Sequence, residues 1–137
     1  MSEREELNRP VIAEFRANAG VVGGQFDGVK MLLLTCQGAR TGQPRTIPLS
    51  YLAHGDTFVV FAANGGRDND PAWLLNLLAH PKAVIEVDTR TLDVVASVVT
   101  GPERDRLWQA EVEQLPWFAG FQQRTARPIS VVLLTPR

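Results

Sequence analysis

Cysteine is almost absent from this chain, since Cys36 is the only one among its 137 residues. A lone cysteine excludes an intrachain disulfide, and such chains are typical of reducing compartments, so we expect a cytoplasmic protein. Cys36 follows the apolar run 31–34 and Thr35. That position favours a half-buried strand thiol over a nucleophile, because free cysteine usually behaves as a small buried side chain.

Long hydrophobic runs and a surplus of charge are absent as well. No apolar run approaches the roughly 20 residues that a membrane-spanning helix needs, and residues 1–6 lack the pattern of a signal peptide. We therefore expect no transmembrane segment, with peripheral membrane association left open. The 14 basic and 15 acidic residues nearly cancel. This balance argues against nucleic acid as a partner and makes any cationic site a local one.

Residues suited to metal binding or nucleophilic catalysis are few. The two histidines, His54 and His80, fall in a turn and at a helix end, and neither has a cysteine or carboxylate at ligand spacing. We expect no metal site and no catalytic side chain of the serine–histidine–acid type.

Glycine and proline fall singly between patterned segments, so we expect one domain over residues 1–137. An N-terminal helix is expected over about 10–19, because Pro10 suits a first helical turn and Gly20 a stop. Hairpin connections dominate over an alternation of strands and helices, which indicates an α+β fold with an antiparallel barrel of about six strands and flanking helices. The expected strands cover 29–37, 45–53, 57–63, 84–88, 92–100 and 129–134, and further helices start near 71, 102 and 116.

A basic, glycine-punctuated turn separates the first two strand-like runs. Arg40 and Arg45 flank Thr41 and Gly42 there, and glycine lets the backbone approach a ligand closely. Guanidinium groups, a hydroxyl and free N–H groups together suit phosphate or carboxylate oxygens. The turn therefore predicts a local anion site, and an ordinary solvated hairpin turn is the alternative.

The stretch from Asn64 to Leu77 carries a second candidate site. A Gly-Gly pair follows a buried strand and precedes a helix capped by Asp70 and Pro71. Several backbone N–H groups and the helix N-terminus then point toward one region, as in anion or carbonyl sites. Ordinary connection chemistry is the alternative here.

Together these two segments resemble the deazaflavin (F420)-dependent nitroreductase and quinone reductase family of actinobacteria. The resemblance runs from about Asn8 to Leu134. It is carried by Phe15-Arg16, Leu33-Leu34-Thr35, Gly38, the stretch 41–45, Pro48-Leu49, Gly65-Gly66, Pro71, Trp73, Asn76-Leu77, Pro81, Arg104, Thr125 and Arg127-Pro128-Ile129.

The resemblance implies a split β-barrel, similar to that of flavin-mononucleotide oxidases, with coenzyme F420 in a groove beside it. The cofactor's phosphate and acidic tail are then held by Arg40, Thr41, Gly42 and Arg45, and its ring lies near Pro48. The rest of the groove is implied to be lined by Ala62, Ala63, Asn64, Gly65, Gly66, Pro71, Trp73 and Asn76.

This chain departs from the family at several positions. Ala39 replaces one member of a basic pair and Asn64 replaces a lysine, which leaves Arg67 as an alternative contact for the tail. The positions implied to contact the acceptor carry tyrosines in quinone- and nitroimidazole-reducing members, whereas this chain has no phenol at any of them. They are Ser50, Leu115, Phe118 and Phe121. Phe118 and Phe121 are also suited to core packing with Trp108 and Trp117, which is the alternative for them.

The implied activity is hydride transfer from reduced F420 to a hydrophobic, electron-poor acceptor such as a quinone, an enone or a nitroaromatic. The cofactor supplies the reactive chemistry in such a reductase, so no side-chain nucleophile is needed. Two alternatives stay open: a non-catalytic protein that binds the cofactor or an apolar ligand, and a reductase that uses flavin mononucleotide (FMN). The assembly is expected to be a monomer or a homodimer.

Overall fold

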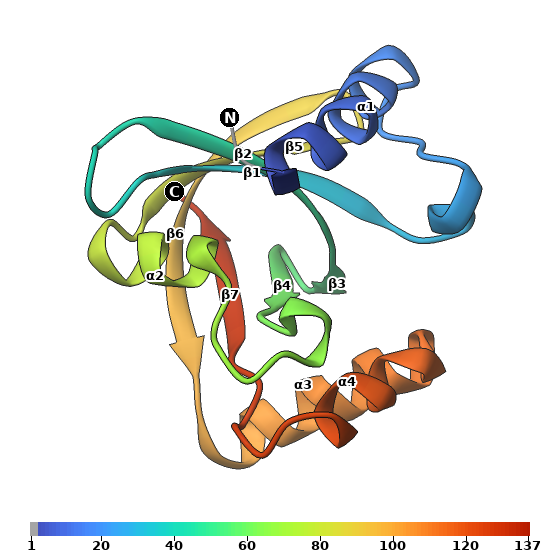
Figure 1. The fold of residues 1–137 in the computed structure, drawn as a ribbon, viewed down its shortest axis with the longest axis vertical. Coiled ribbons are helices and arrows are strands. Elements are labelled where there is room, and N and C mark those ends of the chain that lie inside the picture. The colour runs from blue at the N-terminus through green and yellow to red at the C-terminus, as the bar shows by residue number, and fades with distance from the viewer. Residues whose placement is uncertain (1–2) are drawn as a thin grey trace.

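The computed structural model describes residues 3–137, so the first two residues of the domain predicted over 1–137 lie outside the described residues. Figure 1 shows the chain as a curled sheet with helices around it. The helices are α1 (Glu3–Ala17), η1 (Gly24–Phe26), η2 (Asn64–Gly66), α2 (Ala72–Ala79), α3 (Gly101–Gln114), η3 (Pro116–Phe118) and α4 (Ala119–Gln123). The strands are β1 (Met31–Gln37), β2 (Pro44–Ser50), β3 (Leu52–His54), β4 (Thr57–Phe61), β5 (Lys82–Val87), β6 (Arg90–Val99) and β7 (Val131–Pro136).

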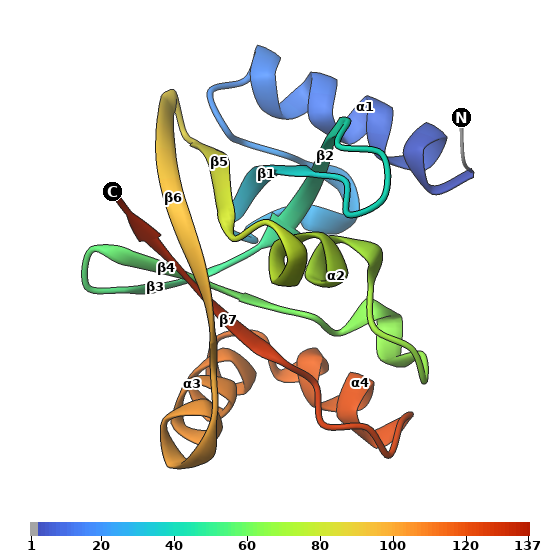
Figure 2. The same cartoon turned by 90° about the vertical axis from the view of Figure 1, so that its left-hand side faces the viewer.

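The described strands form one seven-stranded sheet in the order β2-β1-β5-β6-β7-β4-β3, and every neighbouring pair is antiparallel. Strands β2 and β3 stand at opposite edges of this order, yet Tyr51 alone separates them in the chain. The sheet must therefore curl until its two edges meet at Tyr51 (Figures 1 and 2). The prediction of an antiparallel split barrel is confirmed.

Closure also explains why seven strands are present where six were predicted. The run 45–53 reads as one strand, but the chain leaves one edge and joins the other within it. The Tyr51 N–H donates to the Lys30 carbonyl at 3.1 Å, and its ring meets Phe58 edge-on at 5.5 Å. A turn between edges depends on contacts far apart in sequence, so local alternation does not reveal it.

Helix α1 begins at Glu3 rather than near Pro10, and it ends at Ala17. Pro10 therefore lies inside the helix, where it lacks an N–H to donate. Packing compensates, because Phe15 is 1% exposed in a cluster with Val22, Met31 and Leu33. Beyond the end of the helix, Gly20 adopts φ +92°, and a Cβ there would lie 2.8 Å from the Asp88 Cα.

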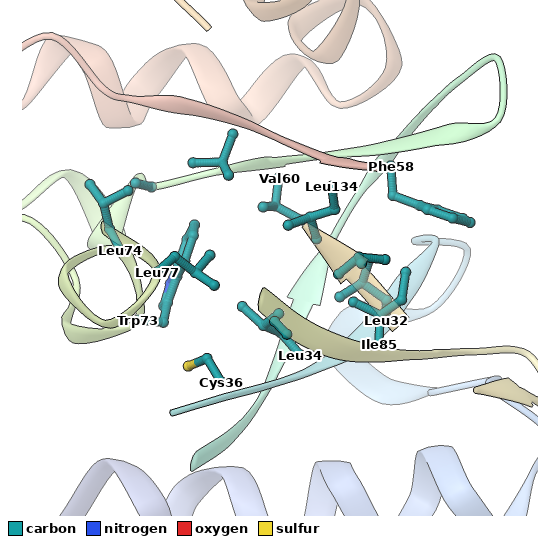
Figure 3. Close-up of a cluster of buried hydrophobic side chains, with 14 of the residues drawn as sticks. Leu32, Leu34, Cys36, Phe58, Val60, Trp73, Leu74, Leu77, Ile85 and Leu134 are labelled. Carbon is teal, nitrogen blue, oxygen red and sulfur yellow. The ribbon is translucent and has the colours of Figure 1, made fainter. Parts of the chain in front are cut away.

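The interior of the barrel is filled by strand side chains and closed on one side by α2. Figure 3 shows Trp73 and Leu77 of α2 facing Leu34 and Cys36 of β1, and Leu74 of α2 belongs to the same buried cluster. Each of these side chains is at most 6% exposed, and burying a leucine contributes about 1.5–3 kcal/mol. Packing of this buried face in the barrel fixes the position of α2, and with it the positions of the other side chains of the helix.

The other helices occupy the two ends of the barrel. Helix α1 lies at one end, and α3 and α4 lie at the other (Figures 1 and 2). Beneath α3, Leu107 and Leu115 pack with Val59, Phe61 and Ile129 in a separate buried cluster. Among the described helices, none has the length and apolar character needed to cross a bilayer.

Candidate functional site

A cavity of about 720 Å³ lies between α1, the turn that joins β1 to β2, and α2. Three stretches far apart in the sequence build its walls, and α2 takes its place because its inward face is fixed in the barrel. The lining residues are Glu5, Asn8, Arg9, Ile12, Cys36, Gly38, Ala39, Arg40, Thr41, Pro44, Arg45, Thr46, Ile47, Ala72, Trp73, Leu75 and Asn76.

The β1–β2 turn is a hydrogen-bonded loop from Gly38 to Gln43. The Gly38 N–H donates to the Gln43 carbonyl at 2.8 Å, and the Gly42 N–H donates to the Gly38 carbonyl at 2.9 Å. The Thr41 hydroxyl accepts from the Gln43 N–H at 3.2 Å, and Gly42 has φ +73°. These bonds hold the loop in a defined shape and present Arg40 at the edge of the cavity.

The charge of the cavity wall is predominantly positive. Among the described residues, Arg9, Arg40 and Arg45 line it with one carboxylate, Glu5, whose Oε1 lies 3.1 Å from Nη1 of Arg45. Both partners of this ion pair are about half exposed, so the pair contributes little to stability. Since the floor is formed by apolar side chains such as Ile47 and Trp73, the cavity suits a ligand with an apolar body and an anionic end.

Asn76 connects α2 to the basic turn. Its Oδ1 accepts from the Ala39 N–H at 3.0 Å, and its Nδ2 donates to the Cys36 sulfur at 3.7 Å. Burial raises the pKa of the Cys36 thiol, more than the Asn76 hydrogen bond lowers it. Cys36 is therefore a neutral thiol at the cavity floor. It is a strand thiol as the sequence favours, but it is fully buried rather than half-buried.

Five of the residues implied to hold the cofactor come together in the cavity wall: Arg40, Thr41, Arg45, Trp73 and Asn76. The others lie outside this lining. They are Gly42, Pro48, Ala62, Ala63, Asn64, Gly65, Gly66 and Pro71. Arg67, the alternative contact for an anionic tail, also lies outside it, and the third guanidinium in the wall comes from Arg9.

The structure gives packing reasons for several residues of the Gly-Gly segment. A Cβ on Gly66 would lie 2.9 Å from the Arg124 side chain and from the Phe121 carbonyl, so α4 approaches too closely for any larger residue. Gly65 has φ +66° with open space around it, and Asn64 donates to the Asn69 carbonyl at 2.9 Å. Pro48 is half-buried in β2, opposite Leu33.

The residues implied to contact the acceptor lie outside the cavity lining. Phe118 and Leu115 are 4% and 9% exposed in the cluster beneath α3. The Phe118 ring meets those of Phe61, Trp108, Trp117 and Phe121 at 5.1–5.9 Å. Ser50 ends β2, opposite Met31, and Phe121 is half-buried on α4.

The contribution of α1 to the cavity was missed in the sequence. Glu5, Asn8, Arg9 and Ile12 recur at positions i, i+3, i+4 and i+7, which places them on one face of a helix. Because the predicted helix began at Pro10, the first three of these residues fell outside it. A helix predicted to start before Glu5 would have placed these four residues on one helix face.

Glu111 was also missed, although it is fully buried on α3. Neither of its carboxylate oxygens has a hydrogen-bond partner in the described part of the chain, and burial raises its pKa to about 7. Its spacing of four residues from Leu107 on α3 and from Leu115 just after the helix places it on the apolar face. That spacing is the signal in the sequence that could have identified it.

Comparisons with known proteins find relatives of this chain in both sequence and structure. A family model described as F420H(2)-dependent quinone reductase matches residues 7–136. An F420H(2)-dependent quinone reductase of Mycobacterium tuberculosis (strain ATCC 25618 / H37Rv) is 39% identical over 129 residues, which cover 91% of this chain and 87% of the relative. A solved F420-H2-dependent reductase, FDR-A, has a TM-score of 0.71 and 30% identity over 77% of this chain and 93% of its own. A structure described as a domain-swapped dimer has a TM-score of 0.73 and 29% identity over 96% and 95%.

Proposed function

Because this chain belongs to the F420H(2)-dependent quinone reductase family, we propose that its cavity between α1, the β1–β2 turn and α2 holds coenzyme F420. The protein is an F420-dependent oxidoreductase that reduces a small-molecule acceptor. The resemblance to the F420-dependent reductases and its implied cofactor are thereby confirmed.

The residues of the cavity fit this cofactor. F420 has a planar deazaflavin ring and an anionic tail, and the cavity combines an apolar floor with three guanidinium groups at its wall. We assign the tail to Arg40, Arg45 and Arg9, because guanidinium groups form charge-assisted hydrogen bonds with phosphate and carboxylate oxygens. We assign the ring to the apolar surface around Ile47 and Trp73. This pairing of an apolar floor with clustered guanidiniums carries the proposal.

The other residues implied by the family remain part of the proposed site. Gly42 shapes the turn, Pro48 lies on the neighbouring strand β2, and the segment 62–66 with Pro71 leads into α2. Their proposed task is to complete the groove beyond the cavity wall.

The reduced cofactor supplies a hydride when it is bound. This chain's residues bind the cofactor, orient it and keep water away from the apolar floor, so none of them needs to act as a nucleophile. For the acceptor we propose a hydrophobic, electron-poor quinone, enone or nitroaromatic beside Ser50 and Phe121, with the buried side chains of Leu115 and Phe118 supporting the Phe121 ring from the core. Trp117, which is 53% exposed and packs on Phe118 at 5.1 Å, extends that aromatic surface.

A titration of the purified chain with oxidised F420 tests the cofactor assignment. Trp73 lines the cavity, so we expect quenching of tryptophan emission that saturates at micromolar F420 and is not competed by FMN. Reduced F420 is then mixed with menadione, an enone and a nitroaromatic, and its oxidation is followed by absorbance. Absence of F420 binding contradicts the proposed site, and preferential FMN binding supports the flavin alternative. Binding without oxidation by any acceptor supports a storage protein.

For assembly we propose a homodimer, supported by the neighbouring structure described as a domain-swapped dimer, which matches 96% of this chain. For location we propose the cytoplasm, where the buried thiol of Cys36 stays reduced. Sedimentation equilibrium of the full chain distinguishes a monomer of 15.1 kDa from a dimer.

A further inference from the structure

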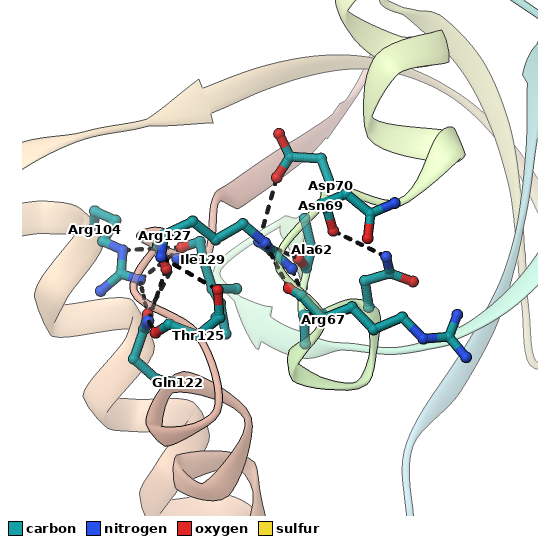
Figure 4. A network of polar contacts seen from close by, with 11 residues as sticks. Ala62, Arg67, Asn69, Asp70, Arg104, Gln122, Thr125, Arg127 and Ile129 are labelled. Carbon is teal, nitrogen blue, oxygen red and sulfur yellow. Dashed lines mark hydrogen bonds and ion pairs between the residues drawn. The ribbon is translucent and has the colours of Figure 1, made fainter.

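Arg127 makes four hydrogen bonds to a single segment of the chain, residues 62–70. Its Nη1 and Nη2 donate to the carbonyls of Ala62 and Ala63 at 3.1 and 2.9 Å. Its Nε donates to the Arg67 carbonyl at 2.9 Å, and Nη1 also pairs with Asp70 Oδ1 at 3.3 Å. Figure 4 shows this guanidinium reaching from the C-terminal loop to both ends of the segment.

The segment 62–70 has little regular structure of its own. Its only helical turn is η2, in which Asn64, Gly65 and Gly66 all have positive φ. Ala62 and Ala63 are 0% and 6% exposed, so their carbonyls need donors from within the protein. One planar guanidinium supplies those donors and pairs with Asp70. The sequence suggested Asp70 as the cap of α2, but Pro71 occupies the cap position and no side chain among the described residues caps the helix.

The backbone of Arg127 is held in turn by residues of the C-terminal region. Its carbonyl accepts from Gln122 Nε2 at 2.8 Å, and its N–H donates to the Thr125 hydroxyl at 3.2 Å. Gln122 also accepts from the Ile129 N–H at 3.1 Å and from Arg104 Nη2 at 3.3 Å. With 14% of its side chain exposed, Arg127 is therefore a fixed point rather than a mobile surface cation.

The fixed segment leads directly into the cavity. Helix α2 starts at Ala72, two residues after Asp70, and Ala72 and Trp73 line the cavity in its first turn. Asn76, one turn further along, holds the backbone of Ala39 in the basic turn. Arg127 thus stands at the start of a continuous set of contacts that runs through α2 to the cavity wall.

We propose that Arg127 is a positioning residue for F420 binding: it fixes segment 62–70 and thereby the N-terminal turn of α2 against the cavity. This inference rests on the proposed function, because it takes the cavity as the F420 site. Arg127 acts through these backbone contacts and lies outside the cavity lining.

The variant that tests the proposal is Arg127→Lys, and Arg104→Lys is its matched control. Lysine keeps the charge beside Asp70, but one ammonium does not reach three carbonyls and a carboxylate in the geometry of a planar fork. Arg104 has a similar exposure of 17% and donates to the Ile129 carbonyl at 2.6 Å, within the same C-terminal network. None of the contacts described for Arg104 involves segment 62–70.

Three measurements are made on the full-length variants. Oxidised F420 is titrated by tryptophan quenching, the KM values for reduced F420 and for menadione are compared, and amide hydrogen exchange is followed at Gly66 and Arg67. For Arg127→Lys we expect the Kd and KM for the cofactor to rise about tenfold, the KM for menadione to change less than about twofold, and exchange at both amides to accelerate. For Arg104→Lys we expect the cofactor Kd to stay within about threefold.

If both variants lose the same cofactor affinity and their thermal midpoints fall by the same amount below that of the unaltered protein, the proposal is overturned. That result describes a general loss of stability and no specific role of Arg127. An unchanged Kd in Arg127→Lys also overturns it, while F420 binding by the unaltered protein leaves the proposed function standing. If the unaltered protein binds no F420, both inferences fail. Should Arg127→Lys not fold, Asp70→Asn replaces it, since it removes only the ionic contact; weaker cofactor binding then supports the proposal and unchanged binding overturns it.

Discussion

The Oδ1 atom of Asn76 accepts a hydrogen bond from the Ala39 N–H at 3.0 Å, across 37 positions of the sequence. The same side chain donates to Cys36 at 3.7 Å, so one amide joins the helix α2 to the last part of β1 and to the basic turn. The position of Arg40, the next residue after Ala39, therefore depends on α2.

Replacing Asn76 by alanine should weaken F420 binding about three- to tenfold, because the turn loses its contact with α2. Asn76→Asp should weaken it further at low salt, although it keeps an acceptor for the Ala39 N–H, since it adds a negative charge to a cavity that receives an anion. Both dissociation constants are measured by tryptophan quenching. Equal affinity for the alanine variant and the unaltered protein contradicts the role of this contact.

Charge reversal by Arg40→Glu should raise the dissociation constant for F420 by more than about tenfold, because repulsion replaces a charge-assisted contact. Arg106→Glu is the matched control, since Arg106 is exposed on α3 and does not line the cavity. Titrations at low and high salt check the electrostatic origin. A similar effect of the two substitutions shows that overall charge, and not the turn, sets the affinity.

Arg9→Ala should weaken F420 binding about three- to tenfold, because Arg9 supplies the third guanidinium of the cavity wall. Adding Ala39→Lys to that variant should recover most of the loss, since Ala39 also lines the cavity. Binding titrations of the single and double variants measure both effects. If the added lysine restores nothing, the tail lies away from the basic turn.

Glu5→Gln should strengthen F420 binding about two- to fivefold at low salt, because it removes the carboxylate that pairs with Arg45 at 3.1 Å. Its effect on the free energy of unfolding should stay within about 0.5 kcal/mol, as for other exposed ion pairs. Titration and urea unfolding of the same variant check the two parts. An unchanged affinity means that Arg45 does not contact the tail.

Glu111 should make the folded state less stable as the pH rises. Burial raises its pKa from 4.5 to about 7, so the stability that its neutral form provides is complete below pH 4.5 and is lost progressively up to about pH 7. Relative to Glu111→Gln, the unaltered protein should lose up to about 3 kcal/mol across this interval. Urea unfolding at several pH values measures the difference. Parallel stability profiles for the two proteins contradict a buried neutral carboxyl.

Features set by local pattern were predictable from the sequence. The hairpins of the sheet follow from runs such as 31–37 and 57–61, whose side chains fill the barrel. The closure of the sheet at Tyr51 was not predictable, because the two edge strands that meet there pair with strands that are distant in the chain. The start of α1 was misplaced because Pro10 suits a first turn, whereas packing of Phe15 sustains a helix around it.

Some residues of the candidate site could also be predicted from the sequence, and others could not. The basic turn was identified as an anion site from its own residues, Trp73 was identified through the family resemblance, and both line the cavity. Arg9 joins them from α1, which no local pattern connects to the turn. The contacts of Arg127 to Ala62 and Ala63 span more than 60 positions, and a sequence shows the arginine without showing which carbonyls it serves.

The place of β7 in the sheet has a consequence for how this protein is made. Although β7 (Val131–Pro136) is the last strand along the chain, it lies between β6 and β4 and pairs with both. During translation the two halves of the barrel therefore stay unjoined until these residues leave the ribosome, and a chain that stops before Val131 loses both ladders. Such distant pairing is typical of slow folding, so the barrel closes only after β7 has been synthesised.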